Sequence, residues 1–383
     1  MGLLFTKPTQ DTADGKTLPL SFDSRLPHAN EYQPHARRTL PAEWHSQSAV
    51  QLTWPHLNTD WADYLDEAYR CYVRIAYEIA LRQPLLIVTT DATTLHIWLR
   101  QQLPEHVLAN ITIETIPTND TWARDHGFIT VLSPNGAELH DYRFNGWGGK
   151  FVADQDNAIN ASLFAKGYFK GEYISHLDFE LEGGAIESDG CGTLLVTSEC
   201  LLNPNRNAQF TQLEIEQKLK TWLGIDRVLW LDHGYLAGDD TDSHIDTLAR
   251  LCPNDTIVYV QCTDKADQHY EALHAMEKQL RTFRTANGEQ YRLLPLPMAA
   301  PAYYDNERLP ATYANFLIIN SAVLYPTYGT PVLDEEAAKV LATAFPQYDI
   351  VGIDCQVLIR QHGSLHCATM QFPQGVFTPR KYD

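Results

Sequence analysis

Four polar clusters in the sequence combine residue types that could carry out covalent chemistry. They read Asp120-Thr-Trp-Ala-Arg-Asp-His-Gly, Leu181-Glu-Gly-Gly, Gly238-Asp-Asp-Thr-Asp-Ser-His-Ile-Asp and His362-Gly-Ser-Leu-His-Cys. Each cluster stands beside an apolar, strand-like run, so a rigid element could hold its side chains in place. The third and fourth clusters carry the most information, because they contain a histidine–carboxylate pair and a cysteine.

The third cluster places His244 two residues before Asp246. On a strand the two side chains share one face, whereas on a helix they diverge by roughly 200°. A strand would therefore aim an imidazole and a carboxylate at one ligand. The alternative is an acidic surface loop with a helix N-cap. A calcium loop does not fit, because the ligand spacing and the twelfth-position glutamate are absent.

In the fourth cluster, Cys367 is a candidate nucleophile that directly follows His366. Neighbouring residues on a strand point to opposite faces. We therefore do not expect His366 to activate the thiol, and His244 is the natural candidate for that base. A thiol served by a remote histidine is a common covalent arrangement. The alternative is a buried, inert cysteine.

The first two clusters contribute the carboxylates Asp125 and Glu182. Taken singly, Asp125 could be an ion-pair partner and Glu182 a turn residue. The candidates recur at intervals of about sixty residues, with a double interval before Cys367, as in chains built from repeated units. Such a repeat would place equivalent strand ends around a common axis.

The elements that must position these residues alternate along the chain. A helical pattern runs from Trp61 to Ile79, and Asp91 and Thr211 can cap helices that end near Leu103 and Gly224. Further helices are expected over 267–286 and 334–344, and strands over 84–90, 111–116, 227–231, 256–262 and 349–353. This alternation predicts an α/β fold. We see no domain boundary, so residues 1–383 are expected to form one domain, with 1–40 wrapping its surface.

The segment 145–150 reads Asn-Gly-Trp-Gly-Gly-Lys. It lacks the spacing of a phosphate loop. We predict a tight turn in which glycine tolerates the backbone conformation.

The overall composition narrows the class of partner and the compartment. The 383 residues carry a net charge of −19, which argues against nucleic acid and against an anionic membrane surface. No apolar stretch approaches the roughly 18 residues of a membrane-spanning helix. Seven cysteines, an odd number without CxxC spacing, favour reduced thiols in a cytoplasmic protein.

Taken together, the clusters resemble the agmatine deiminase and bacterial peptidyl-arginine deiminase family of guanidine-modifying enzymes, over nearly the whole chain. The matching motifs are Leu40-Pro-Ala-Glu-Trp, Thr53-Trp-Pro-His, Trp122-Ala-Arg-Asp, Phe144-Asn-Gly-Trp-Gly-Gly-Lys, Leu181-Glu-Gly-Gly, Glu199-Cys-Leu-Leu-Asn-Pro-Asn-Arg-Asn, Gly238-Asp-Asp-Thr-Asp, His244-Ile-Asp and Gly363-Ser-Leu-His-Cys. The sequence departs from the family at Ser243, at His126-Gly-Phe and in the residues before Cys367, which bears on the substrate tail.

The resemblance implies a five-bladed α/β propeller, the pentein fold, and hydrolysis of agmatine to N-carbamoylputrescine and ammonia without a metal or organic cofactor. It implies Cys367 as the nucleophile, His244 as the general acid and base, Asp125 and Asp246 as guanidinium clamps, and Glu182 as a carboxylate that holds His244 and the substrate. We also expect Trp122 and Asp240 at the substrate.

Several alternatives stay open at this stage. A peptidyl-arginine or arginine deiminase would need a basic group for a carboxylate or peptide, and Arg308 could serve or could be structural. The other hypotheses are amidino transfer to an amine and non-catalytic binding of polyamines. The partner is expected to be a small cationic guanidine compound, and a homodimer is also left open.

Overall fold

The computed structural model describes residues 35–379. Most of the segment expected to wrap the surface therefore lies outside the described residues. Its described end does lie along the folded chain, because Thr39 pairs with Leu132 in an isolated bridge and Arg37 forms an ion pair with Asp226 at 2.7 Å.

Strands and helices interleave along the whole described chain, which confirms the α/β class. The α-helices are α1 Leu65–Ala80, α2 Ala92–Gln102, α3 Glu105–Leu108, α4 Ala123–His126, α5 Gly146–Gly149, α6 Asp154–Ala165, α7 Ser198–Leu201, α8 Gln212–Leu223, α9 Tyr270–Leu280 and α10 Pro331–Ala344. Short 3₁₀ turns are η1 Ala62–Tyr64, η2 Gly183–Ala185, η3 Ile245–Thr247 and η4 Leu358–Gln361. None of the described helices is both long and apolar enough to cross a membrane.

Within residues 35–379 the strands form five sheets of three or four strands and one small hairpin, β13 Tyr303–Tyr304 with β14 Glu307–Arg308. The sheet orders are β18-β1-β2-β3, β4-β5-β6, β7-β8-β9, β10-β11-β12 and β15-β16-β17. Their strands are β1 Gln47–Thr53, β2 Leu85–Thr89, β3 Ile111–Thr115, β4 Ile129–Ser133, β5 Gly136–Arg143, β6 Glu172–Glu180, β7 Ile186–Ser188, β8 Thr193–Thr197, β9 Arg227–Leu231, β10 Ala249–Cys252, β11 Thr256–Gln261, β12 Arg292–Pro297, β15 Leu317–Ile319, β16 Ala322–Thr327, β17 Asp349–Asp354 and β18 Thr369–Pro373.

All five sheets share one pairing scheme. In each sheet, one strand pairs antiparallel with a neighbour on one side. On its other side it pairs in parallel with a strand that the chain reaches through a helix. A parallel neighbour requires such a crossover. Helices α6, α8, α9 and α10 supply it in four of the sheets, and α1 to α3 do so in the first.

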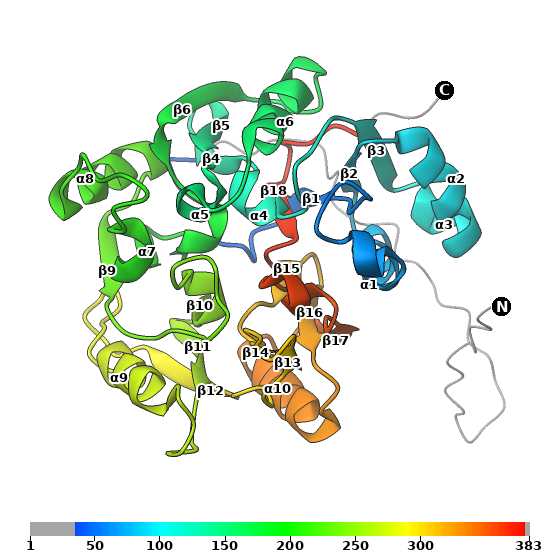
Figure 1. Cartoon of the computed structure of the whole chain (residues 1–383). Coiled ribbons are helices and arrows are strands. Elements are labelled where there is room, and N and C mark those ends of the chain that lie inside the picture. The colour runs from blue at the N-terminus through cyan, green and yellow to red at the C-terminus, as the bar shows by residue number, and fades with distance from the viewer. Residues whose placement is uncertain (1–34, 380–383) are drawn as a thin grey trace, which may run out of the picture.

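Figure 1 shows the sheets distributed around the middle of the molecule, with α2, α6, α8, α9 and α10 at the periphery. The first and last strands, β1 and β18, pair with each other. The end of the chain therefore returns to its beginning. Helix α4 contacts both of these strands, so the segments that precede β18 and form α4 meet near the centre.

Most local expectations about caps and turns are confirmed. Thr211 forms a full capping box with Glu214, and the C-cap of α8 is Gly224, which has a left-handed φ of 68°. The Asp91 side chain accepts a hydrogen bond from the Thr94 amide. The helix expected over 267–286 is shorter than predicted, since α9 spans only Tyr270–Leu280.

The glycine-rich segment at 145–150 is a tight turn, as predicted. Gly146, Trp147 and Gly148 have φ angles of 68°, 54° and 88°, which glycine adopts freely and other residues rarely do. Trp147 adopts this costly conformation and is nevertheless buried. Its indole Nε1 donates a hydrogen bond to Asp125 Oδ2 at 3.0 Å, so the turn delivers a side chain to the first polar cluster.

Candidate active site

The Cys367 thiol lies in the turn between η4 and β18 and is only 4% exposed. Its Sγ is 3.2 Å from Asn315 Nδ2 and 3.8 Å from Asp246 Oδ2. Burial, together with the charges of Asp246 and Asp125, raises the pKa of this thiol well above its ordinary value. The resting group is therefore a neutral thiol, and it needs a nearby positive charge to ionise.

His244 and Asp246 do not lie on a strand, so of the two arrangements considered from the sequence the strand is the one that does not occur. His244 precedes η3, and Asp246 is inside that 3₁₀ turn. The two groups still converge, because a Cβ on Gly184 would lie 2.5 Å from His244 Nδ1 and 3.2 Å from Asp246 Oδ2. Glycine at this position therefore leaves the space in which the imidazole and the carboxylate approach each other.

Asp125, on the short helix α4, is fixed by two donors and lies near the imidazole. Trp147 Nε1 binds one carboxylate oxygen, the Gly184 amide binds the other at 3.1 Å, and that second oxygen lies 3.7 Å from His244 Nδ1. Burial raises the pKa of Asp125 to about 6, with His244 opposing the shift and Asp246 adding to it. A bound cation would stabilise the ionised form of Asp125, which burial disfavours.

The His244 ring is completely buried, and neither ring nitrogen makes a hydrogen bond of ordinary geometry within residues 35–379. Burial alone would lower the pKa of His244, but Asp125, Cys200 and Glu182 together raise it well above its ordinary value. The resting His244 ring is therefore an imidazolium. An imidazolium can donate a proton to a leaving group.

Asp246 is held in its ionised form by the histidine that precedes the thiol. His366 Nδ1 donates to Asp246 Oδ2 at 2.8 Å, and Asn315 Nδ2 donates to the same oxygen at 3.2 Å. Although burial raises the pKa of Asp246, the contact with His366 brings the net value below the ordinary one. The other oxygen, Oδ1, has no partner in the described part of the chain.

Behind His366 lies a buried ionic cluster that the sequence analysis did not identify. His366 Nε2 contacts Glu43 Oε2 at 2.6 Å, Arg250 Nη2 binds the same oxygen at 2.7 Å, and Arg250 Nε binds Glu187. All four side chains are buried. The cluster fixes the ring that in turn fixes Asp246, so we assign it a positioning role.

Changing Glu43 to Gln is expected to destabilise the protein strongly. The substitution leaves Arg250 and His366 buried without their shared carboxylate, and breaking a buried pair in this way typically costs about 3–5 kcal/mol. Urea unfolding measures the loss. The matched control is Glu335→Gln, since Glu335 is exposed and pairs with the exposed Lys339, and its effect on stability should be much smaller. Equal stability of the two variants would contradict the positioning role.

Glu182 is anchored through one of its two oxygens. Arg206 Nε donates to Glu182 Oε1 at 2.7 Å, and Arg206 Nη1 reaches Asp242 Oδ2 at 2.7 Å. The second oxygen of Glu182, Oε2, is buried and has no partner among the described residues. One arginine therefore orients this carboxylate and leaves one oxygen available.

A pocket leads from the surface to Cys367 and Asp125. Its wall is aromatic and acidic, with Trp122, Trp147, Phe151, Asp60, Asp120 and Asp240 among the lining side chains. Trp122 and Asp240, both expected at the substrate, therefore lie along this pocket. Arg308 is not among its lining residues. It forms an ion pair with Asp267 at 2.7 Å, which supports the structural alternative.

The structure brings together all five residues proposed for the chemistry. It also adds Asn315, Trp147, Arg206, Glu43 and Arg250, which the sequence analysis did not single out. Glu43, Trp147 and Arg206 stand inside three of the motifs already quoted for the family resemblance, and Asn315 is a polar residue within an apolar run. For the three residues inside motifs, the motif was the signal that could have identified them. The residues that they contact lie far away in the sequence.

The pKa of Cys367 predicts slow alkylation in the resting protein. Because this pKa is raised, the neutral thiol persists near neutral pH and the reactive thiolate forms only as pH rises above about 9. Iodoacetamide labelling followed by peptide mass spectrometry measures the rate, with the exposed Cys191 as internal control. Cys191 should be labelled first. Fast labelling of Cys367 near pH 7 would mean that the resting group is already a thiolate.

Fold and site together describe an α/β protein with a buried cysteine, a histidine and several carboxylates at the end of an acidic pocket. A family model described as Porphyromonas-type peptidyl-arginine deiminase matches residues 39–373, and the chain belongs to that family.

Three similar proteins place the chain among deiminases. It is 50% identical to a Porphyromonas gingivalis structure described as a putative arginine deiminase, with a TM-score of 0.85 over 89% of this chain and 100% of that one. It is 36% identical to a substrate-bound C. jejuni agmatine deiminase, with a TM-score of 0.81 over 92% of this chain and 99% of that one. It is also 30% identical over 366 residues to the agmatine deiminase of Medicago truncatula, covering 87% of this chain and 96% of that relative.

Proposed function

We propose that this protein is an agmatine deiminase, which hydrolyses agmatine to N-carbamoylputrescine and ammonia. The observation that carries the proposal is a set of buried acceptors without partners beside a buried thiol: Asp246 Oδ1 and Glu182 Oε2. Buried polar atoms are rarely left unpaired. A guanidinium is planar, cationic and rich in N–H donors, so it could satisfy both carboxylates and lie against Asp125 at the same time.

The acidic pocket favours agmatine over arginine. None of the residues described as lining it is a lysine or an arginine, and Asp60, Asp120 and Asp240 contribute carboxyl groups. Agmatine ends in an ammonium group, which this wall would attract. Arginine carries an α-carboxylate, which would meet like charge, and like-charge contacts oppose binding. The nearby Lys150 binds the Asp240 carbonyl and Asp242.

The first half of the proposed reaction forms a covalent amidino-thioether. Asp125 and Asp246 hold the guanidinium beside Cys367. The bound positive charge favours the thiolate, and the thiol proton is released to solvent. The sulfur attacks the central carbon, which becomes tetrahedral. His244 donates its proton to the departing nitrogen, ammonia leaves, and the carbon–sulfur bond remains. Holding the reactants in place makes this attack effectively intramolecular.

The second half hydrolyses the thioether. His244 is now neutral and takes a proton from a water molecule, which attacks the same carbon. The carbon–sulfur bond then breaks, the sulfur leaves as the thiol of Cys367, and the ureido product departs. Glu182, fixed by Arg206, keeps His244 and the substrate in register. The residues of this chain suffice for each step.

The proposal includes the pentein architecture, in which five α/β blades surround one axis within a single domain spanning 1–383. The common pairing scheme of the five sheets and the β1–β18 pairing support it. A cytoplasmic location is part of the proposal as well, supported by the odd number of cysteines. A homodimer stays a possible assembly.

The test of substrate class is a comparison of kcat/KM for agmatine, arginine and an arginine peptide, with the ureido product as the readout. We expect agmatine to be preferred by at least about 100-fold, since a like-charge contact costs several kcal/mol. Equal or faster turnover of arginine or of the peptide would overturn the assignment. Tight agmatine binding without any product would instead indicate a binding protein, and a product transferred to an added amine would indicate amidino transfer.

A further inference from the structure

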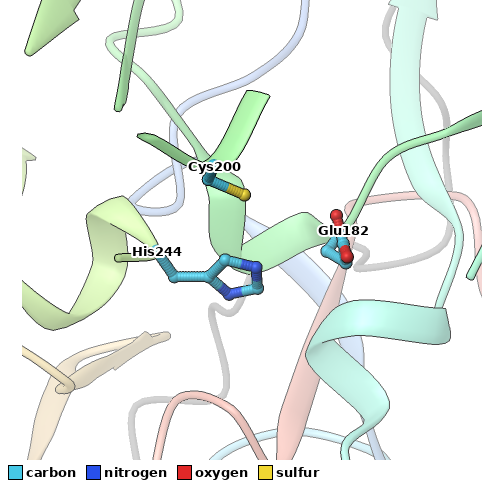
Figure 2. Close-up of side chains that lie close together, drawn as sticks. All are labelled: Glu182, Cys200 and His244. Atoms are coloured by element: carbon cyan, nitrogen blue, oxygen red, sulfur yellow. The ribbon is translucent and has the colours of Figure 1, made fainter. Parts of the chain in front are cut away.

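Glu182, Cys200 and His244 converge in the interior from three separate segments. Glu182 precedes η2, Cys200 lies in α7 and His244 precedes η3. All three are buried, and their carboxylate, thiol and imidazole donor atoms lie within 4.8 Å of one another. Figure 2 shows the three groups at the corners of a triangle, with the Cys200 sulfur above the imidazole and the Glu182 carboxylate to its right. The proposed chemistry uses Glu182 and His244 but gives Cys200 no role.

The donor atoms in this group are only weakly engaged: His244 Nδ1 lies 3.7 Å from Asp125 Oδ1, and the His244 ring interacts with the Cys200 thiol. Both ring nitrogens of His244 and Oε2 of Glu182 make no hydrogen bond within residues 35–379. Arg206 holds only Oε1 and also binds Asp242, so it orients the carboxylate without filling the space between the three donors. A buried set of one sulfur, one nitrogen and one oxygen donor, each facing the others, is a preformed ligand set.

A second group of potential ligands shows what a filled cluster looks like. Glu43, Glu187 and His366 also lie within 4.8 Å of one another. There, however, Arg250 binds both carboxylates, and His366 contacts Glu43 directly. A cation is already present in that cluster as a guanidinium. In the Cys200 group, by contrast, the Arg206 guanidinium binds only Oε1 of Glu182, and Oε2 has no partner among the described residues.

We propose that Glu182, Cys200 and His244 bind a thiophilic divalent cation such as Zn²⁺, and that this binding inhibits the enzyme. Zinc accepts cysteine sulfur, histidine nitrogen and carboxylate oxygen in a tetrahedral arrangement, with a fourth position for water. On binding, the thiol loses its proton to become the thiolate ligand, and the imidazolium loses one proton to become a neutral ligand. The two negative ligands then balance the charge of the ion.

Inhibition follows from the double use of His244. A nitrogen bonded to zinc can neither donate a proton to ammonia nor take one from water. The ion would also occupy Glu182 and add positive charge close to Asp125, where the substrate guanidinium is expected. This inhibitory consequence rests on the proposed function, whereas the binding of the metal does not.

The binding test uses Co²⁺ as a spectroscopic substitute for Zn²⁺ and requires no turnover. The full chain carries Cys367→Ala, so that the proposed nucleophile cannot supply a thiolate. We expect about one equivalent of Co²⁺ to bind, with a thiolate-to-cobalt absorption band and tetrahedral d–d bands. Adding Cys200→Ala should abolish the thiolate band and weaken binding about tenfold or more, since one of three protein ligands is lost.

Two further variants keep this test decisive. Cys191→Ala in the same background should leave the band unchanged, because Cys191 is an exposed thiol outside the group. His244→Asn should weaken Co²⁺ binding while the Cys200 band survives at saturating metal. An absent band, or a band that persists without Cys200, would overturn the site.

The activity test asks whether Zn²⁺ inhibits agmatine turnover through the same ligands. Inhibition of the otherwise unaltered protein should be reversed by a chelator, and Cys200→Ala should require about tenfold or more Zn²⁺ for half-inhibition relative to its own metal-free rate. Equal sensitivity of the two proteins would overturn the inhibitory role. If the chain turns over no agmatine at all, the proposed function fails, while the cobalt titration still decides the metal site.

Discussion

Replacement of Cys367 by alanine is expected to lower kcat for agmatine hydrolysis by at least about 10⁴-fold, as removal of a covalent nucleophile does in other hydrolases. No other side chain in the pocket can form the amidino-thioether, because Cys367 is the only thiol that lines it among the described residues. The rate at which N-carbamoylputrescine is released measures the loss of kcat. Binding of agmatine should persist, since Asp125 and Asp246 remain.

The control for this variant is Cys191→Ala, which removes an exposed thiol that does not line the pocket and should leave kcat unchanged. Substantial turnover by Cys367→Ala would eliminate the covalent route. A direct attack of water on the guanidinium carbon would then have to be considered.

Replacement of His244 by asparagine is the second large expected effect, a loss of about 10²–10⁴-fold in kcat, the usual contribution of a general acid or base. One ring serves both halves of the reaction, so both formation and breakdown of the intermediate should slow. Because the pKa of His244 is raised, the imidazolium persists at pH values above 6.5, the ordinary pKa of histidine, and disappears only as the pH rises further. In the unsubstituted protein, the acid-catalysed first step should therefore survive across neutral pH and fail at alkaline pH.

This pH dependence separates catalysis from simple packing. The pH–rate profile of His244→Asn should lose the alkaline limb that deprotonation of the imidazolium produces. The loss of kcat should be large, whereas the free energy of unfolding should change little. His233→Asn, at an exposed histidine, is the matched control and should keep both the rate and the limb. An unaltered pH profile in His244→Asn would assign the proton transfers to another group.

Sequence reasoning succeeded where the signal is local. Thr211 and Gly224 mark the two ends of α8 through their own side chain and backbone, and the turn at 145–150 is set by its own glycines. The spacing of apolar residues along the sequence is enough to predict that strands and helices alternate. Those features require no knowledge of what lies far away in the chain.

The errors and omissions concern contacts between distant segments. The sequence left open whether His244 and Asp246 share the face of a strand or lie in a loop, and a 3₁₀ turn with the space above Gly184 brings them together. No local pattern reveals that Asn315 lies against Cys367, or that Glu43 and Arg250 meet behind His366. Such contacts exist only after the five sheets have assembled.

The central claim is covalent catalysis by Cys367, and the measurement that tests it most directly is intact-protein mass spectrometry after rapid acid quenching. During turnover of agmatine, the protein should gain the mass of agmatine less ammonia. Peptide mapping should place that adduct on Cys367, and it should decay as N-carbamoylputrescine appears. Turnover without any adduct, or an adduct on another residue, would contradict the account.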